Sequence, residues 1–437
     1  MKTVSFCTLG CKVNQYETEA MITLFKDAGY EISDFGEKCD IYVINTCMVT
    51  GTGERKSRQM INRAHQKNPD ALIAVVGCYS QIAPEKVSKT EGVDIVLGTK
   101  DRHRIVELVE NHLCKTDNKT QSYVEDIMKE RQYEELWITS YEDKTRAFVK
   151  IEEGCTEFCS YCIIPYARGP VRSRPLESIK KEALTLSKNG YTEIVLTGIH
   201  IGSYGRDLPS LSLIDAINTV SETEGIERVR LGSVEPRVLT EDFVKEISKN
   251  PKVCDHFHIS LQSGCDKTLR AMNRKYTTDE YRMAVKRLRD AFDNPAITTD
   301  IITGFPGETR EDFETTLDFV KEIAFSEVHV FPFSPRSGTK AADMDNQIEK
   351  KEREARAKEL IAVANELHKE YINSFLGKKY DVLFEQKCGD GMYEGHMTNY
   401  IKVKVKSETN ICHKTLPVIL KKYDSKAVEA NLVSEYK

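Results

Sequence analysis

The stretch Gly154-Cys-Thr-Glu-Phe-Cys-Ser-Tyr-Cys162 is the most informative part of this 437-residue chain. Its three cysteines have the spacing C-x3-C-x2-C and directly follow an apolar, strand-like run. Three thiolates can bind three irons of a four-iron cluster, which leaves one iron open to another ligand. A closed zinc site typically uses two C-x2-C pairs, and no second pair follows. The spacing favours an iron–sulfur cluster over zinc or a trio of inert core cysteines.

The composition is typical of a soluble globular protein with two or three domains. Charged residues make up 30% of the chain and hydrophobic residues 40%. The longest apolar run, at residues 71–79, is far too short to span a membrane. The start of the chain lacks a signal-peptide pattern. Thirteen cysteines without an export signal predict a cytoplasmic protein with no membrane partner, whose thiols serve metals or catalysis.

Residues 1–114 are predicted to form an open, largely parallel α/β domain. Short apolar runs alternate with helix-like stretches, an order typical of parallel strands joined by crossover helices. The predicted strands are residues 3–8, 41–45, 72–76 and 95–97, and the predicted helices are residues 17–28, 53–67 and 84–89.

Three cysteines of this domain, Cys11, Cys47 and Cys78, each lie just past the end of a predicted strand. Chemistry in open parallel sheets collects at the carboxyl ends of the strands, and Gly10 and Gly77 allow tight turns there. A free cysteine is also common as a small buried residue. Three at equivalent positions in three successive units favour a shared metal site instead.

Residues 141–372, which follow a polar linker at 115–140, are predicted to form a partial (β/α)6 barrel. The active site of such a barrel lies at the mouth formed by the carboxyl ends of the strands, so the cysteines of the opening stretch should lie there. A charged helix at 346–369, with Ile361, Ala364 and Leu367 on its packing side, should close the domain. The predicted strands are 148–151, 193–197, 228–231, 256–261, 297–302 and 327–332, and the helices are 177–188, 211–223, 241–248, 278–290 and 310–323.

The last segment, residues 374–437, is predicted to be a small antiparallel β unit. Apolar residues alternate over 380–385 and 401–406, with a turn expected at 391–395. The segment has eleven lysines and eight acidic residues, whereas residues 1–373 carry a net charge of −8. Three lysines should share one strand face and contact phosphates, although an exposed strand also uses lysine simply for solvation. They are Lys402, Lys404 and Lys406.

The cysteine stretch resembles the signature of the radical S-adenosylmethionine enzymes, in which an aromatic residue, here Tyr161, precedes the last cysteine and a βα barrel follows. The resemblance implies a 4Fe–4S cluster on Cys155, Cys159 and Cys162. It also implies reductive cleavage of S-adenosylmethionine to a 5′-deoxyadenosyl radical. The cofactor contacts that it implies are Thr197 and Gly198 for the methionine moiety, Ser233 and Glu235 for the ribose, and residues 302–304 on the adenine side.

Over essentially its whole length the chain resembles the methylthiotransferases. The resemblance implies that Cys11, Cys47 and Cys78 hold a second 4Fe–4S cluster and that the last segment is a TRAM domain, a small RNA-binding β-barrel. The auxiliary cluster would carry the inserted sulfur, methylated by one S-adenosylmethionine, while the barrel cluster would cleave a second molecule. An electron donor such as flavodoxin or ferredoxin is also implied. The matching stretches are residues 8–19, 45–47, 76–78, 154–169 and 172–174.

Residues 11–17 and 162–174 most resemble the branch that converts N6-threonylcarbamoyladenosine at position 37, in the anticodon loop of tRNA, to its 2-methylthio derivative. The basic last segment agrees with an RNA substrate. Three arginines beside the cluster could bind the carboxylate of the threonylcarbamoyl group, or could instead be solvated or contact phosphates. They are Arg168, Arg172 and Arg174.

Other acceptors stay open, namely isopentenyl-adenosine 37 of tRNA and an aspartate of a ribosomal protein. A non-catalytic RNA-binding protein with structural zinc is the alternative from a different class.

Overall fold

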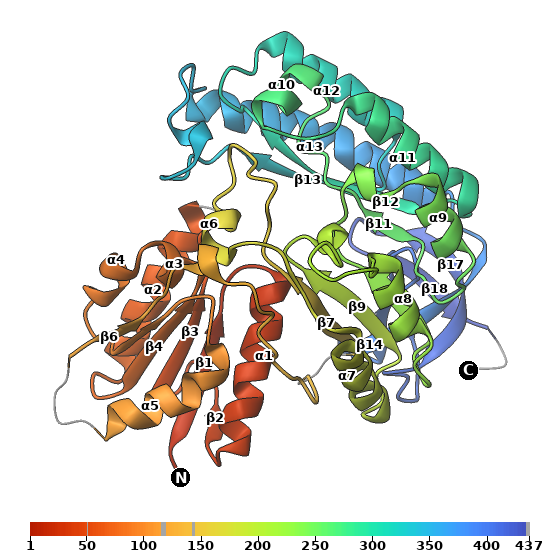
Figure 1. Ribbon diagram of the computed structural model, residues 1–437. Helices are drawn as coiled ribbons and strands as arrows, with labels where there is room; N and C mark the ends of the chain where they lie inside the picture. Colours follow the sequence, from red (N-terminus) through yellow and green to blue (C-terminus); the bar gives the residue numbers. More distant parts are fainter. Residues whose placement is uncertain (50, 115–118, 142–144, 434–437) are drawn as a thin grey trace.

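The computed structural model describes the whole chain except residues 50, 115–118, 142–144 and 434–437. Three parts follow one another: an α/β domain with a parallel sheet, a partial βα barrel and a closed β-barrel at the C-terminal end (Figure 1). The predicted fold class is confirmed.

The N-terminal sheet has six strands in the order β2-β1-β3-β4-β5-β6, and all its pairings are parallel. All residues of β3 and β4 are buried, as expected for strands covered by helices on both faces. Helices α1 and α5 pack on one face and α2, α3 and α4 on the other. The strands are β1 (Thr3–Thr8), β2 (Glu31–Ser33), β3 (Ile41–Thr46), β4 (Leu72–Gly77), β5 (Ile95–Leu97) and β6 (Gln121–Tyr123), and the helices are α1 (Lys12–Asp27), α2 (Gly51–Lys67), α3 (Cys78–Ile82), α4 (Pro84–Ser88) and α5 (Ile105–Leu113).

Strand β2 and helices α3 and α5 were not predicted from the sequence, and two further features of this domain also differ from the prediction. Strand β6 lies inside the predicted linker and pairs in parallel with β5, so part of residues 115–140 extends the sheet. Helix α1 begins at Lys12, directly after Cys11, rather than at residue 17. This earlier start places the side chains of the first two helical turns next to the barrel.

The central domain has six parallel strands, as predicted, arranged as a partial barrel. They form the sheets β10-β9-β7-β8 and β11-β12-β13, which are joined by the isolated bridges Val229–Val253 and Val234–Ile259. The short strand β8 is antiparallel to β7. The strands are β7 (Arg146–Glu153), β8 (Arg172–Ser173), β9 (Glu193–Gly198), β10 (Arg228–Leu231), β11 (His256–His258), β12 (Ala296–Thr303) and β13 (Glu327–Pro332), and the helices are α6 (Ile164–Arg168), α7 (Leu176–Lys188), α8 (Leu213–Ser221), α9 (Glu241–Ser248), α10 (Asp266–Ala271), α11 (Thr278–Ala291) and α12 (Arg310–Ile323).

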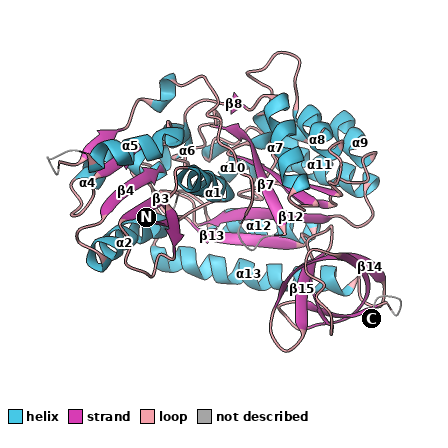
Figure 2. Ribbon diagram, turned by 90° about the horizontal axis from the view of Figure 1, so that it is seen from below, coloured by secondary structure: helices cyan, strands magenta, loops and turns pink. Residues whose placement is uncertain are grey.

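The long helix α13 (Lys350–Asn373) runs along the barrel domain and ends at the C-terminal barrel (Figure 2). Leu360 and Ala364 are buried on its packing side. Ile361, which the sequence placed on that side, is 41% exposed, so the predicted phase of the helix was wrong at this residue.

The C-terminal domain is a closed barrel of five strands in the order β14-β15-β16-β18-β17. The turn predicted at 391–395 is wrong, because residues 392–396 form strand β15 and the chain turns at Gly389 and Gly391, both with positive φ. A Cβ atom at Gly395 would lie 2.2 Å from the carbonyl oxygen of Leu383, so this glycine serves a close strand contact. The strands are β14 (Lys379–Lys387), β15 (Met392–His396), β16 (Lys402–Lys406), β17 (Thr415–Tyr423) and β18 (Val428–Leu432).

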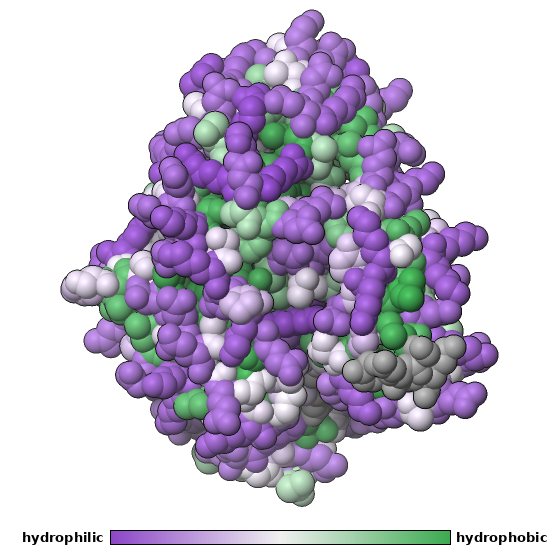
Figure 3. All heavy atoms as spheres, turned by 90° about the vertical axis from the view of Figure 1, so that its right-hand side faces the viewer, coloured by the Kyte–Doolittle hydropathy of each residue, from purple (hydrophilic) through white to green (hydrophobic). Residues whose placement is uncertain are grey.

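The face that carries α8, α9 and part of the C-terminal barrel is mostly hydrophilic, with hydrophobic side chains only in small patches (Figure 3). Among the described residues, no helix combines the length and apolar character needed to cross a membrane.

Candidate functional site

The N-terminal cysteine triad, Cys11, Cys47 and Cys78, lies at the carboxyl edge of three neighbouring strands, β1, β3 and β4. A Cβ atom at Gly10, whose φ is +107°, would lie 2.8 Å from Cβ of Cys47, so only glycine allows this approach. Burial raises the pKa of Cys78, Arg168 lowers it, and the nearby Cys11 raises it again. The nearby Cys78 likewise raises the pKa of Cys47. The predicted convergence of these three thiols is therefore present.

The second triad, Cys155, Cys159 and Cys162, lies in the loop between β7 and α6, at the mouth of the barrel. The loop is anchored by backbone hydrogen bonds from Cys155 to Gly169 (3.0 Å) and from Ser160 to Met272 (3.0 Å). Burial raises the pKa of Cys162 to about 12, and the charges of Cys159 and, more weakly, Cys78 add to the increase. Helix α3, which begins at Cys78, packs against α6, which follows Cys162, so the two triads lie near one another across the domain boundary.

The spacing of the sulfur atoms tests whether either triad fits one metal ion. In the described part of the chain, the groups of three ligand atoms within 4.8 Å of one another contain only histidine and carboxylate side chains. Two sulfurs on one zinc, with bonds of about 2.3 Å, lie at most about 4.6 Å apart. In each triad the three sulfur atoms are therefore too far apart to bind one zinc ion together. Three cysteine thiolates are, in contrast, suitable ligands for an iron–sulfur cluster.

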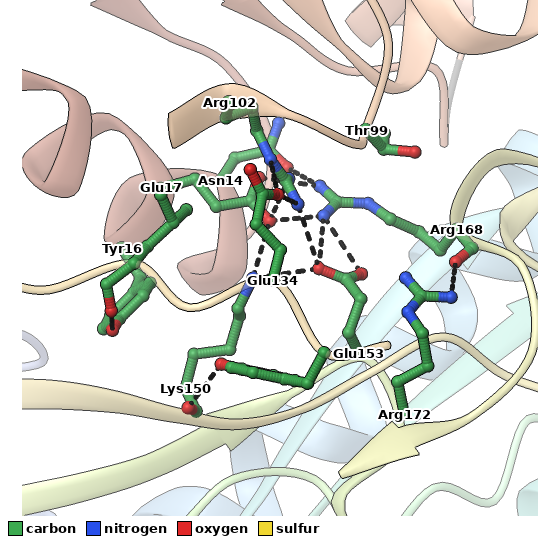
Figure 4. A network of polar contacts seen from close by, with 12 residues as sticks. Asn14, Tyr16, Glu17, Thr99, Arg102, Glu134, Lys150, Glu153, Arg168 and Arg172 are labelled. Carbon is green, nitrogen blue, oxygen red and sulfur yellow. Dashed lines mark hydrogen bonds and ion pairs between the residues drawn. The ribbon is translucent and has the colours of Figure 1, made fainter. Parts of the chain in front are cut away.

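Arg168 connects the N-terminal triad to both domains, and Figure 4 shows its polar contacts with Asn14, Glu17 and Glu153. Its Nε atom donates a hydrogen bond to Sγ of Cys78 at 3.2 Å, and its Nη2 atom donates to Oδ1 of Asn14 at 2.6 Å. The guanidinium also pairs with Glu17 of α1 and with Glu153 of β7. Asn14 in turn donates to the carbonyl groups of residues 9 and 46, next to the cysteine-bearing turns.

This polar network contains as many buried cations as carboxylates. Lys150 pairs with Glu17 at 3.3 Å and with Glu153 at 2.9 Å, and Arg102 pairs with both and with Glu134. Arg102 belongs to the 3-10 helix η1 (Arg102–Arg104) of the N-terminal domain. Balanced pairing is needed because an unpaired charge buried this deeply is very costly. The network fixes the N-terminal triad relative to the barrel.

Arg274 has a corresponding position beside the second triad. Its Nη1 atom donates to Sγ of Cys159 at 3.1 Å, and its Nη2 atom lies 2.8 Å from a carboxylate oxygen of Glu235. Each triad therefore has one cysteine that accepts a hydrogen bond from a buried arginine.

A cavity of about 770 Å³ lies between the first turn of α1, the barrel strands and the C-terminal domain. This volume is in the range of sites that enclose a small organic ligand. Cys11 of the N-terminal triad lines it, as do three of the residues predicted to bind S-adenosylmethionine, which are Thr197, Gly198 and Ser233. Most of the other lining side chains are polar, namely Lys12, Arg230, His256, His258, Thr298, Asp300, Glu327, His329 and Tyr400.

The turn after β9 has features that fit a bound cofactor. A Cβ atom at Gly198 would lie 2.8 Å from Oε2 of Glu152, so a side chain there would fill this space. The other oxygen of Glu152 is buried and has no hydrogen-bond partner among the described residues, and burial raises the pKa of this carboxyl well above its usual value. A donor group of a ligand would satisfy that oxygen.

Glu235, predicted to bind the ribose, is 4% exposed and does not line this cavity. Its carboxylate pairs with Arg274 and Arg237. Ile302, on the predicted adenine side, lines a neighbouring pocket together with Tyr161 and Cys162.

The three arginines predicted to bind the substrate carboxylate are already engaged. Arg168, Arg172 and Arg174 are at most 2% exposed. Arg174 pairs with Glu182, and Arg172 donates to the backbone carbonyl groups of residues 168 and 170. None of them lines the cavity next to Cys11. Arg168 and Arg174 therefore have a structural role, because their buried guanidinium groups are already paired with carboxylates. Arg172 is buried as well, and the Nε atom of its guanidinium has no hydrogen-bond partner among the described residues.

The lysines of β16 share one face, as predicted. Lys402, Lys404 and Lys406 alternate with the buried Val403 and Val405. Lys406 is exposed, and Lys402 lies 3.6 Å from Glu394.

The C-terminal barrel docks on the barrel domain next to the cavity. Arg230 donates to the carbonyl oxygen of Thr398 at 2.7 Å and pairs with Glu193 at 2.8 Å, while Arg146 pairs with Glu385 at 3.1 Å. Both guanidinium groups lie within 5 Å of the ring of Tyr400, at 4.8 and 4.9 Å.

Sequence reasoning missed Asn14, Glu17, Arg274 and Lys12, although three of them lie within six residues of Cys11. The one available signal was a set of polar residues in the first turns of an otherwise amphipathic helix. Their contacts depend on how two domains meet, which local patterns do not contain.

Comparison with known proteins supports this arrangement. Residues 149–320 match the family model described as the Radical SAM superfamily, and residues 3–98 match Uncharacterized protein family UPF0004. A Bacillus subtilis protein named threonylcarbamoyladenosine tRNA methylthiotransferase MtaB is 43% identical, covering 96% of this chain and 93% of its own length. A tRNA-2-methylthio-N(6)-dimethylallyladenosine synthase of Alkaliphilus oremlandii is 37% identical, with 86% and 81% covered.

A solved structure shares the fold of most of the chain. It is the radical S-adenosylmethionine methyltransferase TsrM of Kitasatospora setae, with a TM-score of 0.57, 15% identity, and 77% of this chain and 75% of that chain covered.

Proposed function

We propose that this chain, which belongs to the family of radical S-adenosylmethionine tRNA methylthiotransferases, converts N6-threonylcarbamoyladenosine at position 37 of tRNA to its 2-methylthio derivative. Relatives named for this reaction match at 36–43% identity, and relatives named for the dimethylallyladenosine reaction match at 33–38%. Names alone therefore do not decide the acceptor.

The observation that carries the proposal is the approach of the two cysteine triads at the domain boundary, next to a cavity that Cys11 lines together with three of the residues predicted to bind the cofactor. We assign one 4Fe–4S cluster to Cys155, Cys159 and Cys162 and a second to Cys11, Cys47 and Cys78. When bound, the clusters and two molecules of S-adenosylmethionine would supply the adenosyl radical and the methylated sulfur that replaces a C–H bond by C–S–CH3. The residues of the chain bind and orient: the Thr197–Gly198 turn and Ser233 would hold the cofactor, and Arg168 fixes the N-terminal triad through Cys78.

The cavity walls favour the threonylcarbamoyl acceptor. They carry lysine, histidine, threonine and carboxylate side chains, whereas large apolar side chains are few among the described lining residues, namely Val13, Leu231 and Phe331. A dimethylallyl group is apolar and gains most from apolar walls. A threonylcarbamoyl group has a carboxylate, a hydroxyl and a urea that polar walls can satisfy.

The tRNA would be held in part by the lysine face of β16, through the phosphate backbone. A cytoplasmic location and an electron donor such as flavodoxin or ferredoxin follow from the same proposal, because the tRNA pool and low-potential carriers are found there.

Nucleoside analysis of tRNA from a deletion strain tests the acceptor. We expect the 2-methylthio-threonylcarbamoyl nucleoside to disappear, its unmethylthiolated precursor to accumulate, and a plasmid copy to restore the product. An unchanged level of that product would refute the proposal, and loss of the 2-methylthio-dimethylallyl nucleoside instead would identify the second acceptor. Anaerobic reconstitution should yield about eight irons per chain, as two four-iron clusters require; a colourless zinc protein would exclude radical chemistry.

A further inference from the structure

Lys12 lines the cavity, and its positive charge has no acidic partner among the described residues. It begins α1 directly after Cys11, and its side chain is exposed toward the cavity. No hydrogen bond or ion pair of its ammonium group occurs among the described residues, and the nearest ring is that of Phe148, at 5.9 Å.

The other cations near this part of the cavity already have carboxylate partners. Arg230 pairs with Glu193 at 2.8 Å and Arg146 with Glu385 at 3.1 Å. His258 lies 3.3 Å from Asp300. Among the described residues that line the cavity, Lys12 is thus the cation whose charge is available to bind a ligand.

The electrostatic surroundings of Lys12 favour the binding of an anion. The guanidinium groups of Arg146 and Arg230 lie 4.9 and 4.8 Å from the ring of Tyr400, which lines the same cavity as Lys12. Three positive charges converge here, and a bound carboxylate would relieve their mutual repulsion.

Two further groups at this end of the cavity point to a polar ligand. Tyr400 has a φ of +71°, a left-handed conformation that is unfavourable for a bulky residue, and its ring lies 5.0 Å from that of His256. The Nδ1 atom of His256 is buried without a hydrogen-bond partner among the described residues. Burial lowers the pKa of His256 well below its usual value, so the ring is neutral and can bind a polar group without repelling Lys12.

We propose that Lys12 binds the carboxylate of the substituent on the target adenine and thereby selects a carboxylate-bearing nucleoside over an uncharged one. This inference rests on the proposed function, because it assigns the threonylcarbamoyl carboxylate to a residue. It differs from the sequence-based assignment to Arg168, Arg172 and Arg174, which the structure shows in other contacts. The recognition needs only one ammonium group, since Lys12 acts as a point charge without a bidentate geometry.

Equilibrium binding of two anticodon stem-loop RNAs tests this role without relying on turnover. One RNA carries threonylcarbamoyladenosine at position 37, and the other carries the same nucleoside with its carboxylate as a methyl ester. The reconstituted wild-type protein should prefer the free carboxylate by about tenfold or more, the range of one charge-assisted hydrogen bond. Lys12→Met should bind both RNAs equally, Lys12→Arg should keep a preference, and Lys26→Met, at the other end of α1, should behave as wild type.

The outcomes separate this inference from the proposed function. If the wild-type protein shows no preference, or if Lys12→Met keeps it, the role of Lys12 is refuted even when the enzyme forms the 2-methylthio-threonylcarbamoyl product. If the wild-type protein does not form that product, the proposed function itself fails. Iron content and cleavage of S-adenosylmethionine show whether Lys12→Met is correctly assembled, and the wild-type comparison of the two RNAs needs no variant.

Discussion

The Nε atom of Arg168 lies 3.2 Å from Sγ of Cys78, so a side chain of the barrel domain donates a hydrogen bond to a cysteine of the N-terminal domain. The same guanidinium binds Glu17 and Asn14 on α1 and Glu153 on β7. A single buried residue thus links the N-terminal triad, the helix that follows Cys11 and the strand that leads to the second triad. The geometry between the triads is set by side chains as much as by the backbone.

Replacement of Arg168 should therefore destabilise the fold and disturb the N-terminal triad. Arg168→Met leaves Glu17 and Glu153 with one cation fewer, and breaking a buried pair typically costs about 3–5 kcal/mol. Denaturant unfolding and iron content measure the two effects. The control is Arg310→Met, because Arg310 is 47% exposed and its pairs with Glu314 and Glu359 are solvated surface pairs that should contribute little to stability. Equal losses of stability and of iron in the two variants would contradict the role of Arg168 as the buried residue that links the two domains.

Arg274 should raise the reduction potential of the cluster that we assign to the second triad. Hydrogen bonds to the sulfurs of an iron–sulfur cluster help to set its reduction potential, and a donated N–H stabilises the reduced, more negative form. Arg274→Met should therefore make the potential of the barrel cluster more negative and slow its reduction. An anaerobic redox titration followed by electron paramagnetic resonance measures this. Arg237→Met, which removes a partner of Glu235 but no cysteine contact, is the matched control. An unchanged potential in Arg274→Met would rule out the tuning.

The lysine face of β16 should contribute electrostatic binding of tRNA. Each lost phosphate contact lowers the slope of log K against log salt by about 0.7–0.9. Lys404→Ala with Lys406→Ala should thus weaken binding of modified and unmodified tRNA alike and reduce the slope by roughly twice that amount. Lys350→Ala on α13, where the side chain is 81% exposed and pairs with Glu354, should leave the slope unchanged. A slope that is insensitive to the β16 lysines would mean that they are merely solvated.

The cysteine triads could be predicted from sequence because each depends on local information. One has a compact spacing, and the other follows from the rule that parallel strands end at the same edge of a sheet. Four of the six strands of the N-terminal sheet were predicted within about one residue, since buried parallel strands are continuous apolar runs, whereas the short strands β2 and β6 were missed.

The contacts across domain boundaries could not be predicted in this way. Arg168 looked like a surface cation beside a cluster, and only the packing of α1 against β7 shows that Glu17 and Glu153 neutralise it. Arg174 is likewise neutralised by Glu182 of α7. The strands of the C-terminal barrel were partly missed because Gly395 resembles a turn residue, although it permits a close strand contact.

The most direct test of the central claim, that the two triads have separate tasks, is the product profile of Cys78→Ala. The variant removes one ligand of the N-terminal triad but none of the barrel triad. We expect the reconstituted protein to lose about half its iron and all methylthiolation of the nucleoside while still forming 5′-deoxyadenosine. Cys114→Ala, at an exposed cysteine, should retain both products. Complete loss of 5′-deoxyadenosine in Cys78→Ala, or persistent methylthiolation, would contradict the assignment of the two triads.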